Sequence, residues 1–152
     1  MIKIMFVCHG NICRSPMAEF VMKKMVEERG LVSKFLIASS ATSTEEIGND
    51  IHPGTRRILD KYNVPYTRRQ AVQLERRDYE KYDLFVGMDL ANIRNMHIIF
   101  GADCENKVVK LLDYTSISRD VADPWYTGNF EETWQDINAG CEALLDSLLA
   151  KI

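Results

Sequence analysis

The stretch "IKIMFVCHGNICRSPMAEF", residues 2–20, decides the fold of this chain. Residues 2–8 form an apolar run that only Lys3 interrupts, which is typical of a strand covered on both faces. Ser15 offers a helix N-cap, and Pro16 suits the first helical position. Residues 8–15 are therefore predicted to form a strand-to-helix loop. In an open parallel sheet such a loop lies at the carboxyl edge, where ligands bind.

The rest of the chain alternates predicted strands with predicted helices. The helix after Pro16 carries apolar residues at helical spacing and ends at Gly30. Further strands are predicted over residues 34–40, 83–89 and 106–113. Further helices are predicted from Pro53, over residues 75–82 and 91–100, and over 130–148. This order predicts one α/β domain over residues 1–152, an open four-stranded parallel sheet with helices on both faces.

Composition excludes several classes of function. A net charge of -3 disfavours nucleic-acid binding, and the apolar runs are too short to span a membrane. The N-terminus reads as a strand and not as a secretory signal, so a cytoplasmic protein is expected. The four cysteines are then expected to be reduced: Cys8, Cys13, Cys104 and Cys141. No metal site and no cofactor are expected, because further ligands at short spacing are missing.

Cys8 and Arg14 have the spacing of a nucleophile and an anion clamp. Gly10 and Asn11 can adopt the backbone conformations that turn successive N–H groups inward as an anion nest. The nest and the following helix N-terminus favour a thiolate at Cys8. The guanidinium of Arg14 can hold two oxygens of a phosphoryl group. This arrangement indicates attack of sulfur on phosphorus; the alternative is a buried strand-end cysteine beside a surface arginine.

A second motif, "VADPWYTGN", residues 121–129, follows the last predicted strand. Asp123 could protonate the leaving oxygen of an aryl phosphate as a general acid. Trp125 and Tyr126 could line a slot for an aromatic ring. The alternative for Asp123-Pro124 is an ordinary turn opener.

With these two motifs, the chain resembles a low-molecular-weight protein tyrosine phosphatase over almost its whole length. The segments "VCHGNICRSPMAE" and "DPWY" match the family's phosphate loop and acid motif, and "SSATSTEEIGN" and "GMDLANI" resemble intervening segments. The resemblance implies a metal-free protein phosphatase. Its substrates would be phosphotyrosine proteins or peptides, and phosphate or similar oxyanions would inhibit it.

The resemblance also implies roles for individual residues. Cys8 would form a phosphocysteine, Arg14 would clamp the transition state, and Asp123 would act as general acid and then as general base. Ser15 would donate to the thiolate, Asn11 would brace the loop, and Ser39 would support Asn11. Cys13 would be the redox partner of Cys8, in a reversible disulfide that prevents over-oxidation; the alternative is a small packing residue. The remaining members of the phosphate loop are His9, Gly10 and Ile12.

Three positions depart from the family pattern and concern substrate preference. Glu45 stands where the family often has an aromatic residue on the cleft wall, and Glu46 follows it. An acidic rim disfavours acidic phosphopeptides. Tyr66 replaces a histidine of some members, and Trp125 replaces a common tyrosine. Glu45, Trp125 and Tyr126 are therefore assigned to the substrate cleft.

Other functions remain open on sequence alone. A protein arginine phosphatase could use the same scaffold, but its relatives tend to carry threonine at the position of Ile12. A thiol-dependent arsenate reductase would need a resolving cysteine pair that Cys104 and Cys141 do not form. A non-catalytic phosphoryl-binding or redox-sensing module would not need Asp123. The expected oligomeric state is a monomer or a weak dimer.

Several polar residues are given structural roles. His52 and His97 are expected on the surface or in packing contacts. The pairs Arg56–Arg57, Arg68–Arg69 and Arg76–Arg77 are expected on solvated faces, because acidic residues interleave them; the alternative is binding of an anionic partner. Asp89 is expected to cap the helix that follows it; the alternative is support of the loop after Cys8.

Overall fold

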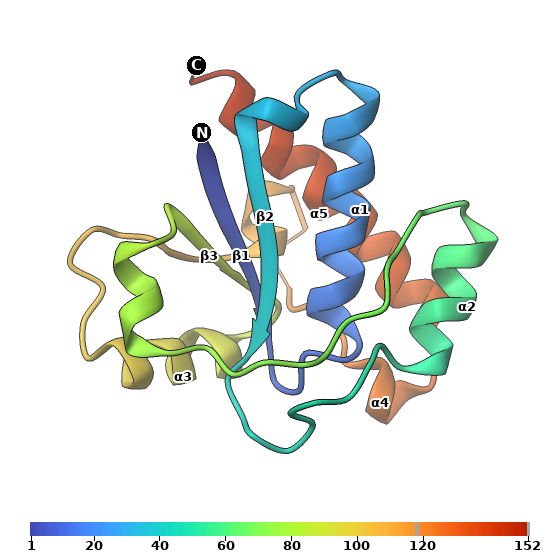
Figure 1. The fold of residues 1–152 in the computed structure, drawn as a ribbon, viewed down its shortest axis with the longest axis horizontal. Coiled ribbons are helices and arrows are strands. Elements are labelled where there is room, and N and C mark those ends of the chain that lie inside the picture. Colours follow the sequence, from blue (N-terminus) through green and yellow to red (C-terminus); the bar gives the residue numbers. More distant parts are fainter. Residues whose placement is uncertain (118, 152) are drawn as a thin grey trace.

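A computed structural model describes residues 1–117 and 119–151, and it contains one parallel sheet with the strand order β2-β1-β3-β4. The strands are β1 (Ile2–Cys8), β2 (Phe35–Ala41), β3 (Leu84–Gly87) and β4 (Val108–Lys110). The helices are α1 (Arg14–Glu28), α2 (Pro53–Lys61), α3 (Leu90–Phe100), α4 (Pro124–Thr127) and α5 (Phe130–Leu149). The predicted α/β class and four-stranded parallel sheet are confirmed (Figure 1).

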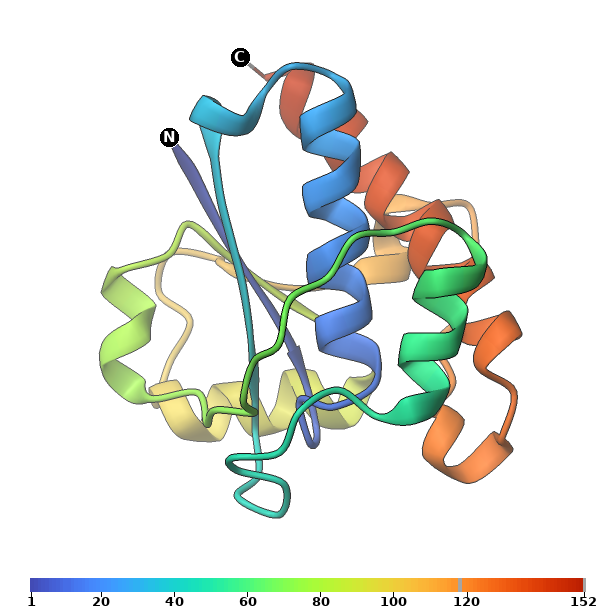
Figure 2. The ribbon, with the colours of Figure 1, turned by 45° about the vertical axis from the view of Figure 1, so that its right-hand side comes forward.

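The two faces of the sheet bury separate apolar clusters, because successive side chains of β1 point to opposite faces. Ile4 and Phe6 pack in the larger cluster, which α1, α2 and α5 cover. Met5 and Val7 pack in the smaller cluster beneath α3. Figures 1 and 2 show α1 and α5 together on one side of the sheet and α3 on the other.

The strand order reverses at β1, which pairs with β2 on one side and β3 on the other. The carboxyl end of β1 is therefore the position where open α/β sheets place their ligands. Cys8 is the last residue of this strand, and α1 begins six residues later at Arg14. No helix in the two described ranges is long and apolar enough to cross a membrane.

Three local predictions need correction. Ser15 does not cap α1 and Pro16 is its third residue, not its first, because the helix already begins at Arg14; the Ser15 hydroxyl lies against the Cys8 sulfur. The helix predicted over residues 75–82 is a short 3-10 helix, Arg76–Glu80. The strand predicted over residues 106–113 contains only three strand residues, and a 3-10 helix, Leu111–Tyr114, follows. Leu111 and Leu112 lie in this 3-10 helix and are completely buried. The apolar run therefore reflects burial in the core and not membership of a strand.

Candidate active site

The loop after β1 folds around the sulfur of Cys8. The backbone N–H groups of Asn11 and Ser15 donate to Cys8 Sγ at 3.3 and 3.4 Å. The hydroxyl oxygen of Ser15 lies 3.0 Å from the same sulfur. Three donor-capable groups therefore converge on one buried thiol, and such an arrangement stabilises a thiolate.

Asn11 holds this loop in a conformation that most residues avoid. Its φ of 58° lies in the left-handed region, where asparagine is among the few tolerated residues. The side-chain Nδ2 donates to Ser15 Oγ at 2.8 Å and to Ser39 Oγ at 3.0 Å. The carboxamide oxygen accepts from the backbone N–H of Val72 at 3.2 Å. The structure thus brings together Asn11, Ser15 and Ser39, the three residues to which a supporting role was assigned.

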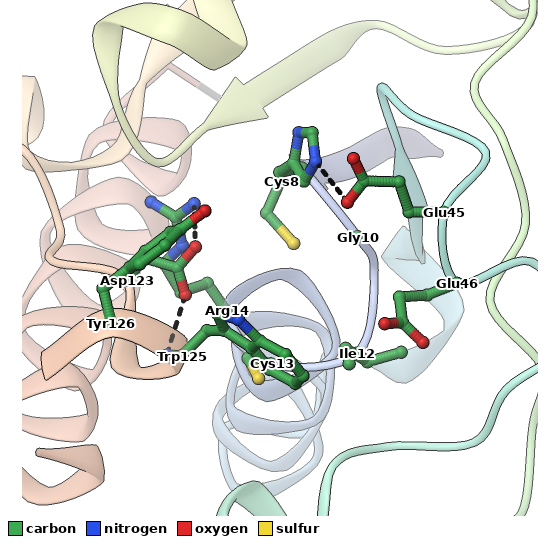
Figure 3. A pocket seen from close by; sticks show the side chains of 11 residues that line it. Cys8, Gly10, Ile12, Cys13, Arg14, Glu45, Glu46, Asp123, Trp125 and Tyr126 are labelled. Carbon is green, nitrogen blue, oxygen red and sulfur yellow. Dashed lines mark hydrogen bonds and ion pairs between the residues drawn. The ribbon is translucent and has the colours of Figure 1, made fainter. Parts of the chain in front are cut away.

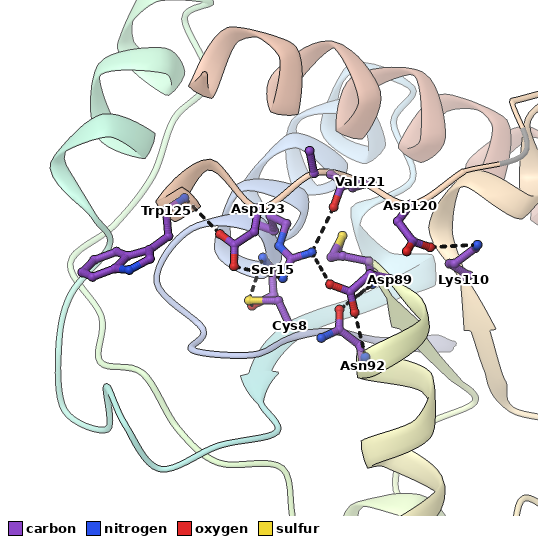
Figure 4. Close-up of polar contacts among 12 residues, drawn as sticks. Cys8, Ser15, Asp89, Asn92, Lys110, Asp120, Val121, Asp123 and Trp125 are labelled. Carbon is purple, nitrogen blue, oxygen red and sulfur yellow. Dashed lines mark hydrogen bonds and ion pairs between the residues drawn. The ribbon is translucent and has the colours of Figure 1, made fainter. Parts of the chain in front are cut away.

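Arg14 is buried, with 2% of its surface exposed, and its guanidinium is held on three sides. Nη1 donates to Asp89 Oδ2 at 2.7 Å and to the carbonyl of Val121 at 3.0 Å, and Nη2 lies 3.4 Å from Asp123 Oδ2 (Figure 4). Burial alone would lower the pKa of Arg14, but the negative charges at Cys8, Asp89 and Asp123 outweigh it and raise the pKa. The guanidinium is therefore a permanent cation in a fixed orientation.

Asp89 combines two functions that the sequence presented as alternatives. Its Oδ1 accepts from the backbone N–H of Asn92 at 2.8 Å, as the predicted cap of α3. Its other oxygen binds Arg14, so the same carboxylate also supports the loop. The first turn of α3 and the guanidinium are thus fixed by one side chain.

Asp123 lies near the loop between β1 and α1, at the start of the short helix α4. Its Oδ1 caps that helix by accepting from the backbone N–H of Trp125 at 3.0 Å. Its Oδ2 points to Arg14. Asp123 is thus a turn opener whose second oxygen faces the candidate site.

A cavity connects these groups and opens to solvent (Figure 3). Its walls come from the phosphate loop, from the segment after β2 and from α4 with its N-cap. They comprise Cys8, His9, Gly10, Ile12, Cys13, Arg14, Glu45, Glu46, Asp123, Trp125 and Tyr126. One rim is aromatic and the facing rim is acidic, and His9 Nε2 meets Glu45 Oε2 at 2.9 Å. Every residue assigned to the substrate cleft therefore lines the cavity.

Cys13 also lines this cavity, and its thiol is largely buried. Burial, followed by the nearby charges of Cys8 and Asp123, raises the pKa of Cys13 to about 12. The Cys13 side chain is accordingly a neutral thiol at physiological pH. The two other cysteines lie elsewhere, Cys104 exposed and Cys141 buried in the core.

One sequence-based expectation about a nearby residue is wrong. Arg69 is half-buried, and its guanidinium donates to the backbone carbonyls of Asn11 and Asn49, so it supports the loop instead of a solvated face. Tyr66 does not line the cavity; it packs edge-on against Phe20. The partners of Arg69 are distant in sequence, so no local pattern marks its role.

His52 and His97 have the structural roles expected of them. His52 accepts from the backbone N–H of Gly54 through Nδ1 at 2.9 Å, and its ring stacks on Phe130. His97 is exposed on α3. In the part of the chain that the structure describes, no three His, Cys, Asp or Glu side chains form a group that could hold a metal ion.

Comparison with known proteins identifies the relatives of this chain. Residues 3–152 match the family model described as low molecular weight phosphotyrosine protein phosphatase. The low molecular weight protein-tyrosine-phosphatase YfkJ of Bacillus subtilis is 40% identical over 150 residues, covering 97% of this chain and 96% of the relative.

Solved structures agree with this result. The crystal structure of YfkJ superposes with a TM-score of 0.95, covering 99% of this chain and 96% of that one. The low molecular weight protein tyrosine phosphatase SP-PTP of Streptococcus pyogenes, 40% identical, superposes with a TM-score of 0.88 and coverage of 97% and 93%. A Drosophila arginine phosphatase, DARP, reaches 0.88 at 22% identity, covering 97% and 98%, which shows the shared fold alone.

Proposed function

Because the chain belongs to the low molecular weight phosphotyrosine protein phosphatase family, whose members hydrolyse phosphate monoesters, we propose that it dephosphorylates phosphotyrosine in two steps through Cys8. The observation that carries this proposal is the convergence of the Asn11 and Ser15 N–H groups on the Cys8 sulfur, with the Arg14 guanidinium beside them. A thiolate in a nest of donors is a nucleophile beside a ready-made oxyanion site.

In the first step the Cys8 thiolate attacks phosphorus and forms the S–P bond while the P–O bond to the tyrosine breaks. Asp123 gives its proton to the departing phenolate oxygen, which leaves as the neutral phenol. Arg14 and the loop N–H groups bind the three equatorial oxygens and stabilise their charge in the transition state. Ser15 donates its hydroxyl hydrogen bond to the sulfur.

In the second step water attacks the phosphocysteine and transfers a proton to the Asp123 carboxylate. The S–P bond breaks, the thiolate of Cys8 returns and inorganic phosphate leaves. Asp123 is then protonated again for the next turnover, so protons balance over the cycle. Inorganic phosphate and similar oxyanions occupy the same nest and act as competitive inhibitors.

The arginine phosphatase alternative depends on Ile12. This side chain lines the cavity and packs with Cys13, Ala71 and Phe130. Its branched bulk, with the aromatic rim of Trp125 and Tyr126, favours a flat aryl ester over a guanidinium phosphate. The arsenate reductase alternative is disfavoured, because neither Cys104 nor Cys141 lines the cavity.

Phosphate release from matched phosphotyrosine and phosphoarginine peptides tests the substrate class. We expect kcat/KM to be roughly tenfold or more higher for phosphotyrosine, with reductant and chelator present. Within the phosphotyrosine set, peptides with basic flanks should exceed those with acidic flanks at low salt, because Glu45 and Glu46 form the rim. The Cys8→Ser variant controls for contaminating phosphatases. A preference for phosphoarginine would contradict the proposed substrate class, although Cys8 could still be the nucleophile.

The proposal includes a redox role for Cys13. Peroxide would convert the Cys8 thiolate to a sulfenic acid, and the Cys13 sulfur would then displace water and form a disulfide, which thiols reduce. The cytoplasm, where such thiols are kept reduced, is the compartment that we infer. The proposed active unit is a monomer or a weak dimer.

The pKa of Cys13 predicts how this protection depends on pH. Because that pKa is raised to about 12 and the thiolate is the attacking form, disulfide closure should be slow near pH 7 and accelerate as pH rises. Samples are oxidised with excess peroxide at pH 8.5 or pH 6.5 and then reduced with dithiothreitol at one common pH. More activity should return after oxidation at pH 8.5 than at pH 6.5, and little in Cys13→Ser, where excess peroxide oxidises the unprotected Cys8 sulfenic acid to forms that thiols do not reduce. Cys104→Ser, an exposed cysteine, is the control and should behave as the parent. Recovery that is independent of pH or of Cys13 would contradict this role.

A further inference from the structure

The segment that leads into Asp123 is tied to α5 by a two-pronged ion pair. Arg119 donates from Nη1 to Asp136 Oδ2 at 2.6 Å and from Nη2 to Asp136 Oδ1 at 2.7 Å. The arginine side chain is 45% exposed, whereas that of Asp136 is 5% exposed. Parallel N–H···O bonds of this kind fix orientation as well as distance.

A second contact joins the same segment to the same face of α5. Thr133 lies three residues before Asp136, so the two side chains share one side of the helix. The Thr133 hydroxyl donates to the carbonyl of Ala122 at 3.1 Å, one residue before Asp123. Both Thr133 and Asp136 are buried polar residues in a helix whose other buried positions are mainly apolar. Buried polar groups of this kind are costly unless they are paired. Residues 119–123, here called the acid segment, supply a partner to each: Arg119 to Asp136 and the Ala122 carbonyl to Thr133, whose hydroxyl also lies within reach of the Asn129 carbonyl.

Residues at the carboxyl edge of the sheet also bind the segment that leads into Asp123. The backbone N–H of Val121 donates to the carbonyl of Met88 at 2.9 Å, and Lys110 lies 2.9 Å from Asp120. Figure 4 shows the chain passing from Asp120 through Val121 to Asp123. The Arg14 guanidinium donates to the Val121 carbonyl at 3.0 Å. The backbone before Asp123 is therefore fixed from the sheet, from Arg14 and from α5.

We propose that Arg119 and Asp136 are positioning residues for the general acid. Their ion pair sets the path of residues 119–122 and so the place of the Asp123 carboxyl opposite Cys8. The inference rests on the proposed role of Asp123. A displacement of about 1 Å in a proton donor can reduce the rate by up to roughly a hundredfold, so a partial release of this segment has a measurable effect.

Leaving-group dependence tests the inference. kcat/KM, which reports the first chemical step, is measured for a series of aryl phosphates from phenyl to dinitrophenyl phosphate. The variants are Arg119→Gln, the double variant Arg119→Gln/Asp136→Asn, and Asp123→Ala. We expect the two Arg119 variants to lose about tenfold on phenyl phosphate and less than about twofold on the dinitrophenyl ester, which leaves without a proton.

The double variant separates positioning from stability. Arg119→Gln alone leaves the buried Asp136 carboxylate unpaired, which destabilises the fold, whereas the double variant removes both charges. A thermal unfolding curve measures the difference. Arg29→Gln is the matched control, because Arg29 pairs with Asp146 on the same helix at 2.8 Å, outside the acid segment, and should retain the parent's leaving-group dependence.

The outcomes are distinct. If Asp123→Ala loses activity mainly on phenyl phosphate and the Arg119 variants do not, the positioning role is overturned and the proposed acid remains. Equal losses across the series in the Arg119 variants would also overturn it, since a merely structural role predicts that pattern. If Asp123→Ala itself shows equal losses, the proposed acid is wrong, and the inference fails with it.

Discussion

Replacing Cys8 by serine should lower the turnover of phosphotyrosine peptides by roughly 10⁴-fold or more. The serine hydroxyl is not ionised at neutral pH, and the neighbouring groups in this loop are donors and not bases, so nothing activates it. The nest itself should survive, because its N–H groups belong to the backbone and Asn11 braces it through Ser15 and Ser39.

Two measurements separate loss of the nucleophile from loss of the loop. Rapid acid quench with a ³²P-labelled aryl phosphate should trap labelled protein from the parent and none from Cys8→Ser. Calorimetric titration with inorganic phosphate should give a comparable affinity for both. Turnover within tenfold of the parent, or label retained on the variant, would remove Cys8 from the role of nucleophile.

Replacing Arg14 by lysine should reduce kcat by about 10³-fold, although the charge is kept. A lysine ammonium is a point donor and cannot hold two phosphoryl oxygens while keeping the contacts to Asp89 and the Val121 carbonyl. The largest loss should be in kcat, because the guanidinium fork fits the three equatorial oxygens in the flattened arrangement that they reach only in the transition state.

Steady-state kinetics on one aryl phosphate checks this, with Arg29→Lys as the control. Arg29 pairs with Asp146 through one nitrogen far from the cavity, so its replacement should leave kcat unchanged. A kcat for Arg14→Lys within threefold of the parent would show that charge alone suffices and that the two-pronged geometry is not required.

The candidate site could be predicted largely from sequence because its proposed reacting groups lie in two short segments. Cys8, Asn11, Arg14 and Ser15 belong to one strand–loop–helix unit, whose bonds span three to seven residues. Asp123 comes from a second motif whose cap geometry is also local. Local spacing therefore carries most of the chemistry, together with the alternation of strand and helix that places both segments at one edge.

The supporting residues could not be predicted in this way. Arg69 looked like half of a solvated arginine pair, yet it binds the carbonyl of Asn11, 58 residues away. Asp89 reaches Arg14 across 75 residues while it also caps α3. Arg119 and Asp136 are unremarkable in sequence, because nothing local shows that an aspartate on α5 faces inward towards the acid segment.

By itself, the sequence determined the sheet class, the phosphate loop and the identity of the nucleophile, clamp and acid candidates, because periodicity and loop chemistry act over a few residues. Only the tertiary structure decided where the fourth strand stops, which arginines are structural and how the acid segment is anchored. Those features depend on hydrogen bonds and ion pairs between residues that are far apart in the sequence. The packing of whole helices and strands brings these residues together, and no short stretch of sequence contains both partners.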